Sequence, residues 1–143
     1  YFVTVSTQHG RHWFGDVVDG VMVQSAAGMM VAHWWMEITN KYPFIQGDAY
    51  VVMPNHLHGI VQFTQSRQQS LPDVMRWFKA MTTNAYIRGV NEDEWPRFPG
   101  KLWQRSYHDH IIRDKGSLER IRVYIRDNPT NWHSDDFHTR PTP

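Results

Sequence analysis

The 143-residue sequence contains no cysteine, which excludes disulfide bonds and thiolate metal sites. Secreted chains of this size often carry disulfides, so the absence of cysteine favours a cytoplasmic protein. The sequence also lacks an apolar run near the ~18 residues that a membrane-spanning helix needs, and no secretory signal segment is visible. We therefore expect no membrane partner.

An initiator methionine is also absent, and the chain begins in mid-pattern with "YFVTVST". We therefore expect that an N-terminal piece precedes the first strand in the complete protein. The sequence shows no internal repeat, no low-complexity segment and no internal domain boundary. The length indicates a single domain over residues 1–143 with one hydrophobic core.

Basic residues are scarce in the first half of the chain. Of the 15 lysine and arginine residues, only Arg11, Lys41 and Arg67 precede Arg76. The remaining basic residues are interleaved with tryptophan, phenylalanine and tyrosine. This mixture suits phosphates and stacked nucleobases, although an ordinary solvated surface would have the same composition.

The hydrophobic pattern alternates between strand and helix periods along the chain. It predicts strands over residues 1–7, 44–53, 56–63 and 102–113, and helices over residues 25–40, 70–89 and 117–129. Asp19-Gly20 is a turn signal, Gly89 is expected to end the second helix, and Ser117 is expected to be the N-cap of the third. Residues 64–70, residues 91–101 and the tail after Asn128 are expected to lack regular structure. The order β-α-β-β-α-β-α indicates an α+β fold with helices packed on a small antiparallel sheet.

Each predicted helix has an expected apolar face. The residues at helical spacing are Met29, Ala32, Trp35, Met36 and Thr39 in the first helix, Leu71, Val74, Phe78 and Met81 in the second, and Leu118, Ile121 and Ile125 in the third.

Two histidines follow the Pro54-Asn55 turn in the stretch "VVMPNHLHGIVQF". Residues i and i+2 of a strand point to the same face, roughly 6.5–7 Å apart along the chain, so His56 and His58 can converge on one metal ion. Leu57 would then face the core. The alternative is that one histidine packs in the sheet and the other is partly solvated.

A tyrosine and an asparagine on the third predicted helix could join the histidines. Tyr124 and Asn128 are four residues apart and can share one helical face. Tyr124 flanks the apolar face beside Arg120 and could point along the sheet, although a tyrosine between Val123 and Ile125 is also explained by packing. Asn128 precedes a proline, which disfavours helical geometry at that position.

These residues carry a family resemblance. The sequence resembles the single-tyrosine HUH transposases, an IS200-like superfamily, and within them the REP-associated tyrosine transposases. The matching stretches, in family order, are "YFVTVSTQHGRHWFG", "AYVVMPNHLHGIV", "RWFKAMTTNAYIRG" and "FPGKLWQRSYHDHIIRDKGSLERIRVYIRDNPTNW". His56-Leu57-His58 matches the HUH triplet, Tyr124 matches the nucleophilic tyrosine, and Asn128 matches the third metal-ligating amide. The departure is at the N-terminus, where the family usually has extra residues before the first strand.

The resemblance implies a ferredoxin-like α/β sandwich and a divalent metal, Mg²⁺ or Mn²⁺, held by His56, His58 and Asn128. It also implies cleavage and rejoining of single-stranded DNA that carries palindromic hairpins, through a 5′-phosphotyrosine on Tyr124. Relatives act as monomers or homodimers. Six basic residues are the candidate DNA contacts: Arg76, Lys79, Lys101, Arg105, Arg113 and Arg120.

Two other functions fit parts of the same pattern. A domesticated, noncatalytic DNA-hairpin-binding protein would bind the same DNA without cutting it. A metal-dependent hydrolase would also use His-x-His, but it would need further ligands such as Asp109 and His110 to activate water.

Overall fold

The computed structural model describes residues 1–65 and 70–134. Its strands are β1 (Phe2–Ser6), β2 (Gly15–Val18), β3 (Val21–Gln24), β4 (Ile45–Met53), β5 (His56–Phe63) and β6 (His108–His110). Its helices are η1 (Gln8–Gly10), α1 (Ala26–Lys41), α2 (Leu71–Asp93), α3 (Lys115–Arg126) and η2 (Trp132–Ser134). The loop expected over residues 64–70 lies mostly outside the described residues, as does the tail from residue 135.

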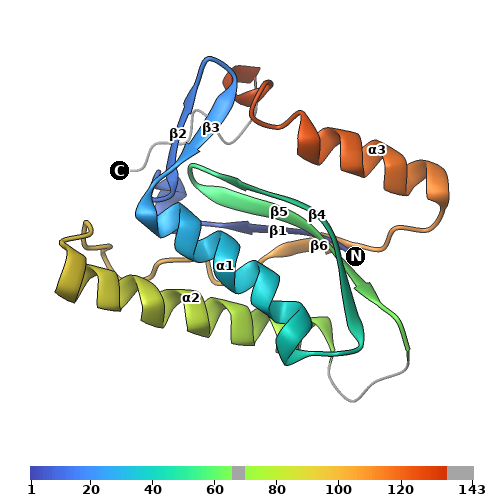
Figure 1. Cartoon of the computed structure of the whole chain (residues 1–143), viewed down its shortest axis with the longest axis horizontal. Coiled ribbons are helices and arrows are strands. Elements are labelled where there is room, and N and C mark those ends of the chain that lie inside the picture. Colours follow the sequence, from blue (N-terminus) through green and yellow to red (C-terminus); the bar gives the residue numbers. More distant parts are fainter. Residues whose placement is uncertain (66–69, 135–143) are drawn as a thin grey trace.

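Four of the strands form one antiparallel sheet in the order β4-β5-β1-β6 (Figure 1). Helices α1 and α2 cover one face of this sheet, and α3 lies over the other. Apart from the β2–β3 hairpin, the chain runs β-α-β-β-α-β up to α3, which is the ferredoxin-like arrangement. The predicted α+β fold, with helices on a small antiparallel sheet, is therefore confirmed.

The main core lies between the sheet and the α1–α2 layer. Val3 and Val5 of β1 and Leu57 of β5 point into this layer and are fully buried. Gly59 lies on the same face, and a Cβ atom at that position would meet the Trp35 ring at 2.3 Å. Because neighbouring residues of a strand point to opposite faces, His56 and His58 lie on the other face of the sheet, away from α1 and α2.

Two predicted helix features are wrong. Met29 and Met36 of α1 are 59% and 58% exposed; of the predicted face only Trp35 is buried, together with Ala27, Gly28, Val31 and Ile38. Apolar residues occur on several faces of this helix, so its periodicity was ambiguous. Helix α2 continues past Gly89 to Asp93; the glycine instead makes room for the Trp95 ring, which a Cβ would meet at 2.2 Å.

The boundaries of β6 and α3 also differ from the prediction. The strand expected over 102–113 is only three residues long, with a separate bridge between Thr7 and Trp103. The N-cap of α3 is Asp114, whose side chain accepts a hydrogen bond from Ser117 N at 2.7 Å, so Ser117 is already inside the helix.

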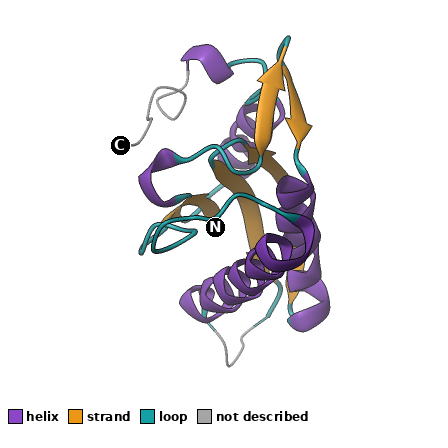
Figure 2. Ribbon diagram, turned by 90° about the vertical axis from the view of Figure 1, so that its left-hand side faces the viewer, coloured by secondary structure: helices purple, strands orange, loops and turns teal. Residues whose placement is uncertain are grey.

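The β2–β3 hairpin was not predicted as a pair of strands, although its Asp19-Gly20 turn was. It forms a two-stranded sheet of its own next to β4, at one end of the molecule (Figure 2). The tail contains a short helical turn, η2, anchored by the buried Trp132. Within residues 1–65 and 70–134, the helices fall short of the length and apolarity that a membrane span requires.

Candidate active site

The two histidines lie side by side on the sheet face that α3 covers. Pro54 and Asn55 turn the chain from β4 into β5, and the new strand begins with His56. Both imidazoles are buried, and their ring centroids are 4.6 Å apart. The predicted shared face of His56 and His58 is therefore present, with Leu57 on the core side.

Hydrogen bonds to Nδ1 orient both rings. The Nδ1 atom of His56 lies 2.8 Å from Asn55 Oδ1, and the Asn55 amide is itself oriented by donation from Nδ2 to Gly10 O at 3.3 Å. Because an amide oxygen only accepts, His56 Nδ1 must donate, which places the lone pair of the neutral ring on Nε2. His58 Nδ1 pairs with Thr4 Oγ1 at 2.8 Å. Such partners are typical of metal-binding histidines.

Burial keeps both imidazoles neutral. Desolvation lowers the pKa of His58 from its ordinary value to about 4. The pKa of His56 is lowered well below its ordinary value, first by desolvation and then by repulsion from His58, while the neighbouring Asn128 side chain acts in the opposite direction. A neutral imidazole is the form that binds metals, so the pair is in the right state at neutral pH.

The Asn128 side chain completes a set of three donors. Helix α3 ends at Arg126, so Asn128 lies beyond the last helical turn, as the following proline requires. Its Nδ2 donates to Tyr124 O at 3.3 Å. Its Oδ1 is buried and accepts no hydrogen bond from the described residues. A buried acceptor left in this way is costly unless an ion or water satisfies it, so the donor set fits a divalent cation.

Among residues 1–65 and 70–134, no acidic side chain supplements this site. Within the described residues, no three His, Cys, Asp or Glu side chains are grouped closely enough to hold a metal ion. Asp109 and His110, which a metal-dependent hydrolase would need to recruit, therefore do not join the histidine pair.

Tyr124 reaches the same face from α3. Its ring centroid lies 5.3 Å from that of His58 and 6.1 Å from that of Phe2, and its side chain is 45% exposed. A tyrosine placed in this way contacts the histidine pair and remains accessible to a large substrate. The structure thus brings Tyr124, His56, His58 and Asn128 together.

The other tyrosines considered are engaged elsewhere. Tyr86 is a buried residue of α2 and donates from its hydroxyl to Pro96 O at 2.7 Å. Burial raises the pKa of Tyr86 to about 12, which disfavours a phenolate. Desolvation and the nearby Asp109 carboxylate also raise the pKa of Tyr107.

The six basic residues proposed for DNA do not form one patch. Lys79, Lys101 and Arg105 line a cleft of about 350 Å³ beside α2, but Lys79 Nζ donates to Gln104 O and Arg105 O, at 2.9 and 3.1 Å. Arg76, also on α2, pairs with Asp73. Helix α2 lies on the sheet face opposite the histidines (Figure 1).

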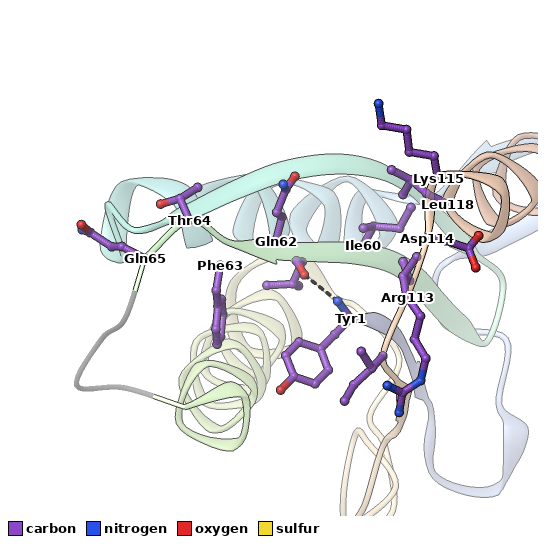
Figure 3. Close-up of a pocket in the computed structure, with 13 residues that line it drawn as sticks. Tyr1, Ile60, Gln62, Phe63, Thr64, Gln65, Arg113, Asp114, Lys115 and Leu118 are labelled. Carbon is purple, nitrogen blue, oxygen red and sulfur yellow. Dashed lines mark hydrogen bonds between the residues drawn. The ribbon is translucent and has the colours of Figure 1, made fainter.

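The remaining two basic residues lie at α3. Arg113 lines a groove of about 610 Å³ at the end of β5, together with Lys115 and Leu118 (Figure 3). Arg120 donates to Ser117 Oγ at 3.0 Å. None of His56, His58, Tyr124 and Asn128 lines the groove, so the groove and the histidine site are separate features.

Sequence reasoning missed other residues on the histidine face. In the sheet, Thr4 of β1 lies opposite His58 of β5 on one side and opposite His108 of β6 on the other, and Phe2 lies opposite His110. Residues directly opposite each other point to the same face of a sheet. His108 and His110, on the exposed strand β6, therefore share the face of His56 and His58. The i, i+2 spacing of the two histidines in "HDH" could have indicated that they share a face. The Trp132 ring stacks on His56 with the ring centroids 6.2 Å apart. No periodic pattern in the sequence pointed to this contact, because Trp132 follows a turn.

Comparison with known proteins connects this site to a family. The family model described as "Transposase IS200 like" matches residues 30–128, which is more than half of the chain and includes both histidines, Tyr124 and Asn128. An uncharacterised protein of Haemophilus influenzae Rd is 30% identical over 161 residues, covering 96% of this chain and 84% of that protein.

Solved structures share the fold. A REP-associated tyrosine transposase bound to a REP hairpin has a TM-score of 0.65 and 20% identity, over 91% of this chain and 66% of that one. A Deinococcus radiodurans R1 protein described as a candidate transposase has a TM-score of 0.52 and 19% identity, over 88% of each chain. The family match and the relative at 30% identity lead to one conclusion: this chain belongs to the IS200-like transposase family.

Proposed function

We propose that this transposase cuts and rejoins single-stranded DNA that carries hairpins, with Tyr124 as the nucleophile and a divalent metal at His56, His58 and Asn128. The observation that carries the proposal is the contact between the exposed Tyr124 ring and His58, beside the buried and unbonded Oδ1 of Asn128.

The chemistry is a reversible transesterification. The Tyr124 oxygen forms a bond to phosphorus and loses its proton, while the bond from phosphorus to the 3′ oxygen breaks and that oxygen takes up a proton. The products are a 3′-hydroxyl and a 5′-phosphotyrosine. Because phenol has a pKa of ~10, phenolate leaves more readily than an alkoxide, and a DNA 3′-hydroxyl can later displace it.

The site suits Mg²⁺ or Mn²⁺. Two neutral imidazoles and one amide oxygen are three protein donors, and imidazole is soft enough that manganese should bind at least as well as magnesium. A metal bound there would orient the scissile phosphate and withdraw charge from its non-bridging oxygens. Asn55 and Thr4 hold the two imidazoles in place.

The fold supports hairpin DNA as the substrate. The similar structure described above is of a transposase bound to a REP hairpin. Single-stranded DNA that folds back on itself would offer the phosphates of a duplex stem to basic side chains and an unpaired strand to Tyr124.

One assay separates the proposed enzyme from its two alternatives. A labelled hairpin-bearing single strand is incubated with the protein and Mg²⁺ or Mn²⁺, then denatured and analysed by gel electrophoresis. A covalent protein–DNA adduct is expected. Tight binding without any cutting would indicate a noncatalytic hairpin-binding protein, and cut DNA without an adduct would indicate a hydrolase.

The cleft beside α2 leads to a prediction on salt dependence. Replacing Lys101 or Arg105 with glutamine should lower the slope of log affinity against log salt by roughly 0.7–0.9 for each lost phosphate contact. Lys79→Gln should change the slope less, because two backbone carbonyls already accept hydrogen bonds from Lys79. Equal slopes for the wild type and the Lys101 and Arg105 variants would remove this cleft from the DNA-binding surface.

A further inference from the structure

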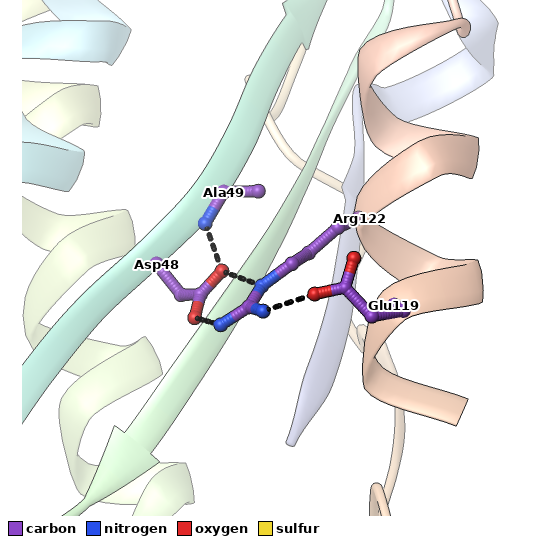
Figure 4. A network of polar contacts seen from close by, with 4 residues as sticks. All are labelled: Asp48, Ala49, Glu119 and Arg122. Atoms are coloured by element: carbon purple, nitrogen blue, oxygen red, sulfur yellow. Dashed lines mark hydrogen bonds and ion pairs between the residues drawn. The ribbon is translucent and has the colours of Figure 1, made fainter. Parts of the chain in front are cut away.

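A bidentate ion pair joins α3 to the sheet two residues before Tyr124. Arg122 Nε lies 2.9 Å from Asp48 Oδ1, and Arg122 Nη2 lies 2.7 Å from Asp48 Oδ2 (Figure 4). Asp48 Oδ1 also accepts from Ala49 N at 2.6 Å, which fixes the carboxylate. The Asp48 side chain is only 13% exposed, and that of Arg122 is 39% exposed, so the pair is partly shielded from water.

An irregularity in β4 presents Asp48 to α3. The β4–β5 register shifts between Gly47 and Tyr50, which leaves one extra residue on β4. Such bulges redirect side chains. Asp48 thereby contacts a helix 74 residues away in sequence.

Helix α3 rests on the sheet mainly through Ile125, its one fully buried residue, while Val123 and Tyr124 are exposed. Apolar contacts of this kind have no preferred direction. The bidentate Asp48–Arg122 ion pair adds a directional link between α3 and β4.

Helical geometry couples this ion pair to Tyr124. Two residues correspond to about 200° around a helix, so Arg122 and Tyr124 project from opposite flanks, with Ile125 on the sheet-facing side between them. Arg122 contacts β4 on one flank, and Tyr124 contacts Phe2 and His58 on the other. If α3 turned by about 10° about its own axis, a side-chain atom about 6 Å from that axis would move by about 1 Å.

We infer that Asp48 and Arg122 are positioning residues that set the rotation of α3 and so hold Tyr124 against the histidine pair. This inference rests on the proposed function, because it assigns the nucleophilic role to Tyr124. A misplacement of about 1 Å in a reacting group can cost about 100-fold in rate, so the ion pair should matter for cleavage more than for binding.

The principal test is Asp48→Asn, because it removes a negative charge and cannot weaken DNA binding by loss of a phosphate contact. Single-turnover cleavage of the hairpin strand should be about 10- to 100-fold slower, with DNA affinity unchanged or slightly higher. Arg122→Gln should slow cleavage by a similar factor, and the double variant should be no slower than either single variant. The control is Glu119→Gln, which removes the exposed partner that Arg122 contacts at 2.6 Å but leaves the link to β4 intact.

A second measurement does not depend on chemistry. Because the chain has no cysteine, Val123→Cys and Met36→Cys give two clean spin-label sites on α3 and α1, both exposed. The distance distribution between the labels should broaden or shift in Asp48→Asn and stay as in the parent in Glu119→Gln. If the parent forms no DNA adduct, the proposed function fails, yet the distances still test the positioning role. A distribution unchanged by Asp48→Asn, or cleavage at the wild-type rate in that variant, would overturn the inference.

Discussion

Replacing His58 with alanine should reduce the rate of DNA cleavage by about 1,000-fold or more. A metal that withdraws charge from the scissile phosphate supplies several kcal/mol of transition-state stabilisation, and about 4 kcal/mol corresponds to a thousandfold. His58 carries the Nδ1 bond to Thr4 that orients its ring, so its loss removes a positioned ligand of the proposed metal. Single-turnover kinetics in Mn²⁺ would measure the decrease.

Binding of hairpin DNA should survive this change, because affinity depends mainly on phosphate contacts by basic residues. The matched control is His33→Ala, which removes an exposed histidine on α1, on the other side of the sheet. That variant should cleave at the wild-type rate. An unchanged affinity for manganese in the His56→Ala, His58→Ala double variant would show that the metal site lies elsewhere.

Tyr124→Phe should abolish the covalent adduct and leave the protein folded. Phenylalanine retains the ring and its edge contacts with Phe2 and His58, and it removes only the hydroxyl that we propose as the nucleophile. The side chain is exposed, so the midpoint of thermal unfolding should hardly change. Denaturing gels with labelled hairpin DNA and metal would show the adduct with the wild type alone.

Tyr107→Phe provides the comparison for this experiment. Tyr107 lies just before β6, and Lys79 Nζ is 5.7 Å from its ring centroid. Its hydroxyl does not enter the proposed reaction, so the adduct should form in this variant at close to the normal rate. Loss of the adduct in Tyr107→Phe together with its survival in Tyr124→Phe would reverse the assignment.

Much of the sheet and the histidine pair could be predicted from local signals. The Pro54-Asn55 turn and the alternation after it are properties of neighbouring residues, so they place His56 and His58 on one face and Leu57 on the other. The four-residue spacing likewise puts Tyr124 and Asn128 near each other, although Asn128 lies just beyond the helix.

Features that depend on distant contacts could not be predicted in this way. Gly89 resembles a helix stop, yet it lies inside α2, where its missing Cβ makes room for the Trp95 ring. Asp48 resembles an ordinary polar residue in a strand, and only the register shift in β4 brings it to Arg122. Met29 and Met36 fit the same helical stripe as Trp35, but the orientation of α1 on the sheet buries Val31 and Ile38 beside Trp35 and leaves both methionines exposed.

The identity of the residue that carries the DNA tests the central claim most directly. Trypsin cuts after Arg105, Arg122 and Arg126, so Tyr124 lies in the peptide VYIR, residues 123–126, where its hydroxyl is the only side-chain nucleophile. Tyr107 lies in a separate peptide, SYHDHIIR, residues 106–113. After reaction with hairpin DNA and Mn²⁺, nuclease trimming and tryptic digestion, tandem mass spectrometry should find a nucleotide phosphate on VYIR. A nucleotide on SYHDHIIR, or on any other peptide, would contradict the assignment of Tyr124 as the nucleophile.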